Sequence, residues 1–129
     1  HGIAINPVTN RIYVNNFDAN QGYANTLTVI DGTRDEIISN ITLSEGWKDL
    51  QLDAASVGLP RVAIDAERNV VYATNYLSKS VSIIDGSSGR VLSKIRLDDD
   101  NPLDVVADSR NGKVYVSSIH SISIFLAEG

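Results

Sequence analysis

Short runs of apolar residues alternate with polar turns along the whole chain. In the first third, the apolar runs lie near residues 3–5, 11–15, 26–31 and 36–43, and the Asn-Pro, Asn and Asp-Gly residues between them are typical of turns. No window of about 11 residues keeps a 3.6-residue apolar period without an intervening Gly, Asn or Pro. The pattern therefore predicts strands throughout and leaves residues 49–56 as the one candidate for a helical turn.

The strand pattern is repeated three times. Each repeat opens with an apolar triplet, continues with Asn or Asp and a short polar stretch, and reaches an apolar run that carries a Tyr. The repeated segments are 3–14, 62–73 and 105–116. Their tyrosines, Tyr13, Tyr72 and Tyr115, stand 59 and 43 residues apart. A period near 43 residues is typical of four-stranded propeller blades, and insertions within 17–25 and 44–58 lengthen the first interval.

The repeats divide the chain into three units with four, four and three predicted strands. The units are about 1–59, 60–101 and 102–129, and the third lacks its fourth strand. Runs such as 70–73 and 81–84 are apolar on both faces, which indicates a sheet packed between two others, because a strand wet on one face would alternate. We therefore predict an all-β fold of propeller blades, each a four-stranded antiparallel meander. An ordinary β-sandwich is the alternative, but it does not explain the repeat.

Three units are too few to close a ring, since propellers typically have four to eight blades. We expect either a piece of a longer propeller or a homo-oligomer whose copies complete the ring together. Two copies would supply six blades. An open stack exposes one face of its first and last blades, and large exposed apolar patches mark association sites.

The tyrosines belong to a short motif that occurs in each unit. Tyr-Val-Asn-Asn at 13–16, Tyr-Ala-Thr-Asn at 72–75 and Tyr-Val-Ser-Ser at 115–118 resemble the Tyr-Val-Thr-Asn signature of the YVTN family of β-propeller repeats. The Val-Ile-Asp-Gly at 29–32 and Ile-Ile-Asp-Gly at 83–86 match the family's framing, although the third unit lacks this turn. The resemblance implies a propeller of the kind found in archaeal surface-layer proteins and in secreted or periplasmic bacterial proteins. It therefore implies an extracytoplasmic location.

Both insertions are expected at the same end of the blades. In a four-stranded meander, the loop between the second and third strands and the loop between blades emerge on one side, and repeat proteins tend to collect insertions on the binding face. Aromatic residues in such loops suit recognition of a protein or glycan surface. The alternative is that Phe17 and Trp47 merely pack the insertions onto the blades. The candidate binding residues are Phe17, Tyr23, Trp47, Tyr76, Lys79 and His120.

Three adjacent carboxylates lie in the next loop between units. They are Asp98, Asp99 and Asp100. Carboxylate oxygens are ligands that Ca²⁺ prefers, so the run is a weak candidate metal site, although it lacks the alternating spacing and Gly turn of an EF-hand loop. The simpler interpretation is a solvated turn.

Other polar residues have local interpretations. Two aspartates precede the glycines of the Asp-Gly turns, and two others occupy, in the second and third units, the turn position of Asn6. All four aspartates are expected to form turn hydrogen bonds. His120 is a candidate general base, but spacing ties no Ser or Asp to it; a polar loop histidine is the simpler interpretation. The turn residues are Asp31, Asp65, Asp85 and Asp108.

Composition narrows the function further. The chain of 129 residues has 11 basic and 16 acidic residues and a net charge of −5, which disfavours nucleic-acid binding. It has no cysteine, which excludes disulfides, thiol catalysis and thiolate metal sites. No apolar run approaches the length of about 18 residues that a membrane span needs. No Gly-rich phosphate loop or paired-carboxylate motif is present, so we expect no cofactor.

The sequence contains no recognisable catalytic motif, and this absence together with the repeat favours a non-catalytic module. We expect a protein-interaction or structural role, with a protein or cell-surface partner. The alternative is an enzyme or cofactor-binding propeller whose site forms only when the ring is complete, with residues converging on its central channel from several blades.

Overall fold

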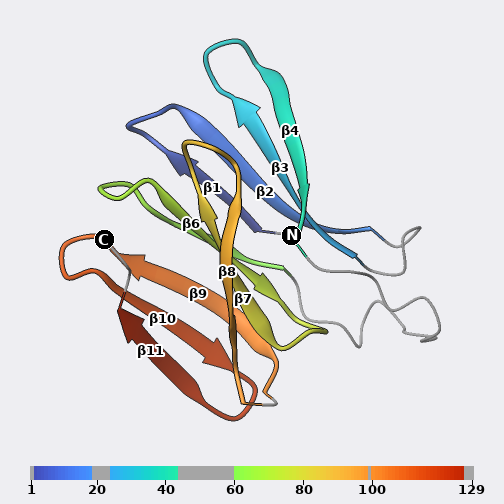
Figure 1. Cartoon of the computed structure of the whole chain (residues 1–129), viewed down its shortest axis with the longest axis vertical. Coiled ribbons are helices and arrows are strands. Elements are labelled where there is room, and N and C mark those ends of the chain that lie inside the picture. The colour runs from blue at the N-terminus through green and yellow to red at the C-terminus, as the bar shows by residue number, and fades with distance from the viewer. Residues whose placement is uncertain (1, 19–23, 44–59, 99, 127–129) are drawn as a thin grey trace.

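The computed structural model describes residues 2–18, 24–43, 60–98 and 100–126, and strands are the only regular secondary structure in them (Figure 1). Eleven strands in this part of the chain form three antiparallel sheets of four, four and three strands, which we call blades 1, 2 and 3. The predicted all-β fold of blade-like meanders, incomplete in the third unit, is confirmed. The candidate helical turn at 49–56 lies outside the described residues.

Within each blade the strands follow one another in chain order. Blade 1 contains β1 (Gly2–Asn6), β2 (Arg11–Asp18), β3 (Ala24–Asp31) and β4 (Glu36–Thr42). Blade 2 contains β5 (Val62–Asp65), β6 (Val70–Asn75), β7 (Ser80–Asp85) and β8 (Val91–Arg96). Blade 3 contains β9 (Pro102–Asp108), β10 (Lys113–Ser118) and β11 (Ile122–Leu126). None of the described residues belongs to a helix with the length and apolarity needed to cross a membrane.

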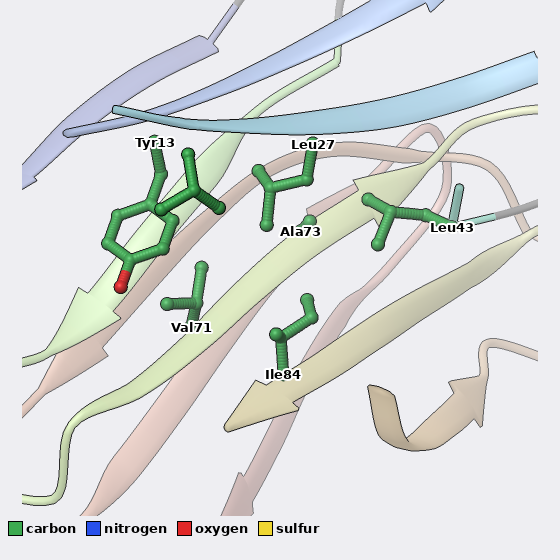
Figure 2. Packing of buried hydrophobic residues seen from close by; sticks show 7 residues of the cluster. Tyr13, Leu27, Leu43, Val71, Ala73 and Ile84 are labelled. Carbon is green, nitrogen blue, oxygen red and sulfur yellow. The ribbon is translucent and has the colours of Figure 1, made fainter. Parts of the chain in front are cut away.

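Blade 2 is buried on both faces, and this packing builds the core. Val71 and Ala73 of β6 pack against blade 1, where Tyr13 and Leu27 point toward them (Figure 2). Successive residues of a strand point to opposite faces, so Tyr72, which lies between those two, packs against blade 3. Every residue of β6 is buried. The two-sided burial predicted from the apolar runs is therefore confirmed.

The first strands of adjacent blades approach one another closely. β1 contacts β5, and β5 contacts β9, so β5 lies between the first strands of blades 1 and 3. Gly2 permits this approach, because a Cβ at this position would lie 2.6 Å from the Cα of Arg61 and 2.8 Å from the carbonyl oxygen of Pro60. Both neighbours are backbone atoms that cannot move aside without shifting blade 2. A glycine is therefore required where the blades meet.

The predicted turn hydrogen bonds are present in all three blades. The backbone N–H of Val8 donates to Asn6 Oδ1 at 3.0 Å, and Asp108 accepts the equivalent bond from the second residue after it. Asp65 accepts instead from the N–H of Arg68, the third residue after it. The turns that follow β3 and β7 contain the same kind of bond. The N–H of Thr33 donates to Asp31 Oδ1, and the N–H of Ser87 donates to Asp85 Oδ1. These polar side chains therefore serve the turns, as expected.

The glycines of the two Asp-Gly turns are required by space and not by a positive φ. Positive φ angles in these turns occur at Asp35 (56°) and Gly89 (74°), and not at Gly32 or Gly86. The N–H of Gly32 donates to the carbonyl oxygen of Asn10 at 2.8 Å, and a Cβ on Gly32 would lie 2.7 Å from Asn10 Oδ1. The glycine thus lets the turn after β3 pack against the turn after β1.

Replacing Gly2 by Ala should destabilise the fold, because the added methyl group meets backbone atoms of blade 2. We expect the free energy of unfolding to fall by about 1–3 kcal/mol, the usual cost of overpacking. Urea denaturation followed by circular dichroism measures the change. Val8→Ala, at an exposed turn position, is the control and should stay within about 0.5 kcal/mol of the wild type. Equal stabilities of Gly2→Ala and Val8→Ala would contradict the close approach of β1 to blade 2.

Candidate functional site

One end of the blades carries the connections between β2 and β3, β6 and β7, and β10 and β11, together with the segments that join successive blades. We call it the loop end, and we call the opposite end the turn end. Because the strands of each blade form antiparallel hairpins, these connections emerge together. Of the candidate binding residues, Tyr76, Lys79 and His120 are described, and all three lie at the loop end.

Hydrogen bonds join the connections at the loop end to one another. The N–H of Leu97 donates to the carbonyl oxygen of Lys79 at 3.0 Å. The side-chain amide of Asn101 donates to the carbonyl oxygen of Tyr76 at 2.8 Å, and the carbonyl oxygen of Asn101 accepts from the N–H of Ile119 at 3.1 Å. The segment between blades 2 and 3 therefore fixes the β6–β7 connection relative to the β10–β11 connection.

A buried carboxylate stands at the centre of this arrangement. Asp100 is only 8% exposed, and it accepts hydrogen bonds from Ser121 Oγ at 2.7 Å, the N–H of His120 at 3.1 Å and the N–H of Asn101 at 3.0 Å. These donors, the Ser121 hydroxyl first among them, hold the pKa of the Asp100 carboxyl below its usual value, because they stabilise the charged form. The interpretation of the acidic run as a solvated turn is therefore wrong for Asp100.

The acidic run has a mixed environment. Asp98 is exposed and has a φ of 45°, whereas the Asp100 carboxylate faces its protein donors. Asp99 lies outside the described residues. Among the described His, Cys, Asp and Glu residues, no group of three or more is placed to hold a metal ion. Metal binding by the run stays a prediction from the sequence.

The imidazole of His120 is the exposed part of the same cluster. Its side chain is 83% exposed, and its Nδ1 lies 3.3 Å from Asp100 Oδ1. The Ser121 hydroxyl donates to Asp100, so within this cluster the serine and the histidine do not form the pair that nucleophilic catalysis needs. A hollow of about 420 Å³ lies beside the imidazole, between Leu97 and Ile122. The cluster therefore presents a polar surface, which the hydrogen bonds to Asp100 keep in place, beside an open hollow.

The remaining aromatic candidates lie at or beyond the edge of the described residues. Phe17 lies in β2, paired with Asn25 of β3, and not in the loop where the sequence places it. The reason is that the two strands continue to pair into the first insertion. Tyr23 and Trp47 lie outside the described residues. Binding by these three residues stays a prediction.

Buried amides at the loop end were not anticipated as contacts between blades. Asn15 Nδ2 donates to the carbonyl oxygen of Arg61 at 2.8 Å, and Asn25 Nδ2 donates to that of Thr74 at 2.7 Å. Asn15 belongs to the Tyr-Val-Asn-Asn motif, so the signal was in the sequence, but its partner is 46 residues away. These bonds satisfy backbone carbonyls of blade 2 with side chains of blade 1.

The arrangement of blades is similar to that of solved β-propeller proteins. Hydrazine synthase from Kuenenia stuttgartiensis superposes on 97% of this chain with a TM-score of 0.72 and 16% identity. AztD from Citrobacter koseri superposes on 82% with a TM-score of 0.60 and 22% identity, and Sqt1 from Saccharomyces cerevisiae superposes on 98% with a TM-score of 0.74 and 19% identity. No protein-family model and no curated protein sequence matches the chain.

The likeness defines the class of protein but not its activity. The chain covers 32% of the hydrazine synthase chain, 25% of the AztD chain and 32% of the Sqt1 chain, so it spans no more than about a third of their length. Together with the three packed sheets, the likeness shows a β-propeller fold of which this chain supplies three blades. A fold of this kind supports many functions, so function has to be argued from the loop end.

Replacing Asp100 by Asn should lower the melting temperature at pH 7, because a neutral amide replaces a charged acceptor of three hydrogen bonds. The folded pKa lies below the unfolded value of about 3.9. The stabilisation is therefore complete above about pH 4 and is lost as the pH falls through the folded pKa. The difference in melting temperature between wild type and variant should shrink from about pH 5 to about pH 2.

Thermal unfolding followed by circular dichroism at both pH extremes measures this difference. Asp98→Asn removes a neighbouring but exposed charge and serves as the matched control, with little change expected at pH 7. Equal melting temperatures of the wild type and Asp100→Asn at pH 7 would show that the buried carboxylate does not hold the loop end.

Proposed function

We propose that this chain is a non-catalytic protein-interaction module of a β-propeller protein and that its loop end contacts the partner. The observation that carries the proposal is the hydrogen-bonded segment between blades 2 and 3. Through Asp100 and Asn101 it fixes connections from two blades as one surface. A surface that is already ordered loses little conformational entropy on binding, which favours association.

The exposed groups on this surface suit a protein partner. Ile119 is 47% exposed, and it lies next to the exposed imidazole of His120. Tyr76 and Lys79, from the connection between β6 and β7, are half-buried at the same end. The hollow beside His120 is lined by other residues of the same end, Leu97 and Ile122 among them. Aromatic, aliphatic and hydrogen-bonding groups at one end of the blades are typical of a protein interface. The aromatic residues predicted in the insertions would extend the same surface.

The proposal includes a YVTN-type propeller of an extracytoplasmic protein, either of the cell surface or secreted. The Tyr-Val-Asn-Asn, Tyr-Ala-Thr-Asn and Tyr-Val-Ser-Ser motifs support it. Antibody detection in fractionated cells tests the location. Protein found in the cytoplasmic fraction alone would contradict this part of the proposal without touching the loop end.

Site-specific photo-cross-linking tests the binding surface. A benzophenone amino acid at Tyr76 should give a discrete adduct with one protein in an extract of the source cells, because this position borders the proposed interface. The same amino acid at Val8, at the turn end, is the control and should give no such adduct. His120→Ala combined with the label at position 76 should reduce the yield of the adduct severalfold.

The outcomes of this experiment separate the alternatives. Adducts of equal yield from positions 76 and 8, or none from either, would contradict binding at the loop end. An adduct that His120→Ala leaves unchanged would remove His120 from the interface. Hydrazine synthase, one of the structural neighbours, is by its name an enzyme. A cross-link that a small molecule abolishes would therefore favour the ligand-binding alternative.

A further inference from the structure

A cavity of about 190 Å³ lies between blades 1 and 2 at the turn end. Blade 1 lines it with residues of β2, β3 and β4, and blade 2 lines it with the end of β7 and the turn that follows. None of these residues lines the hollow beside His120. The cavity is therefore separate from the surface proposed to contact a protein partner.

The cavity contains a buried hydroxyl group that lacks a partner. Tyr13 is 1% exposed, and its ring reaches from β2 toward blade 2 (Figure 2). Among the described residues, no group makes a hydrogen bond to its Oη. Most buried polar groups in folded proteins are hydrogen-bonded, because an unsatisfied one is costly. The hydroxyl therefore points to a polar group that the described part of the chain does not supply.

A cation stands beside this hydroxyl. Arg11 lies two residues before Tyr13 on β2, and its side chain lines the same cavity. Its Nη1 donates to the carbonyl oxygen of Gly86 at 2.9 Å, which ties the guanidinium to blade 2. A guanidinium carries five N–H donors in a planar fork that suits a carboxylate. Burial raises the pKa of the Tyr13 hydroxyl, so this group is a neutral donor at pH 7.

The acidic group of the cavity already serves the turn. Asp85 accepts hydrogen bonds from Ser88 Oγ at 2.8 Å and from the N–H of Ser87 at 3.1 Å. These bonds, that of the Ser88 hydroxyl first, hold the pKa of the Asp85 carboxyl below its usual value. At the Tyr13 hydroxyl, the charge of Arg11 has a larger effect than the charge of Asp85. The group that would complete this part of the cavity is therefore a hydrogen-bond acceptor, and a negative charge suits it.

Apolar side chains form the other walls. Val29, Ile41 and Ile84 belong to the core between blades 1 and 2 and also line the cavity. Ile38 and Ser88 line it as well and are exposed, so the cavity opens to solvent beside them. A cavity of about 150 Å³ accommodates benzene, so this one has room for a molecule of roughly seven non-hydrogen atoms and not only for a water.

We propose that this cavity binds a small aliphatic carboxylate. Its oxygens accept hydrogen bonds from the Arg11 guanidinium and the Tyr13 hydroxyl, and its aliphatic part packs against Ile41 and Ile84. A ligand with a positive charge in place of the carboxylate would meet the guanidinium and is rejected. Because both blades contribute to the cavity, the bound ligand also stabilises the packing of blade 1 on blade 2.

Isothermal titration calorimetry of the purified chain with isovalerate at pH 7 tests the proposal. For a ligand of this size we expect a dissociation constant of about 1 mM. Isoamylamine has a similar aliphatic part but carries an ammonium group, and it should bind at least about tenfold more weakly. Arg11→Gln should weaken isovalerate binding about tenfold or more, because charge-assisted hydrogen bonds are lost. Tyr13→Phe removes one neutral hydrogen bond and should weaken it about threefold to tenfold.

Two matched variants serve as controls. Tyr115→Phe removes the motif hydroxyl of blade 3, and Arg34→Gln removes an exposed arginine of the turn after β3, so both should bind isovalerate as the wild type does. Thermal unfolding without ligand separates binding from folding. Tyr13→Phe removes a hydroxyl that has no partner in the free protein, so its melting temperature should not fall. If one of the two cavity variants fails to fold, the other still tests the site.

Three results would overturn the proposal. The first is the absence of saturable isovalerate binding up to about ten times the expected dissociation constant. The second is isoamylamine binding as tight as that of isovalerate, which would contradict recognition of a negative charge. The third is isovalerate binding that neither Arg11→Gln nor Tyr13→Phe weakens, which would place the ligand elsewhere on the molecule. None of these results affects the cross-linking test of the loop end.

Discussion

The structure depends on covering small sheets that are apolar on both faces. The apolar face of a sheet has to be buried against another element of the fold. Blade 2 has two such faces, and blades 1 and 3 cover them with Tyr13 and with Val114 and Val116. The inner strands then approach so closely that Gly2 has no room for a side chain. The stacking of blades therefore determines both the core and the few positions where backbone meets backbone.

This stacking also determines what the loop end can do. Because all meanders run in the same direction, the connections that vary in length emerge together, while the short, hydrogen-bonded turns emerge at the opposite end. Asp100 shows how the surface is held: its carboxylate is buried beneath the connection that carries the exposed His120. The hydrogen bonds to the buried carboxylate therefore position the backbone of the connection on which the exposed imidazole stands.

The exposed outer faces of blades 1 and 3 follow from the same constraint. Positions that are buried between blades within the chain, such as Leu27, become exposed at the ends, as Ile122 does, although the residue type hardly changes. The outer faces of blades 1 and 3 therefore have the residues of a blade interface, although no other blade of the described residues covers them. The likeness to larger propellers agrees with this, because the chain covers at most about a third of them.

The sequence by itself determined the strands, their repeat and the turn hydrogen bonds, because these depend on residues within one hairpin. The short apolar runs between polar turns, the motif tyrosines and the turn positions of Asp65 and Asp108 are local signals. Only the tertiary structure decided the contacts between hairpins. Asp100 belongs to an acidic run, for which the sequence predicts a solvated turn. Its partners Ser121 and His120 lie about 20 residues further on, in another connection. Spacing along the chain carries no information on such a contact until the blades are packed.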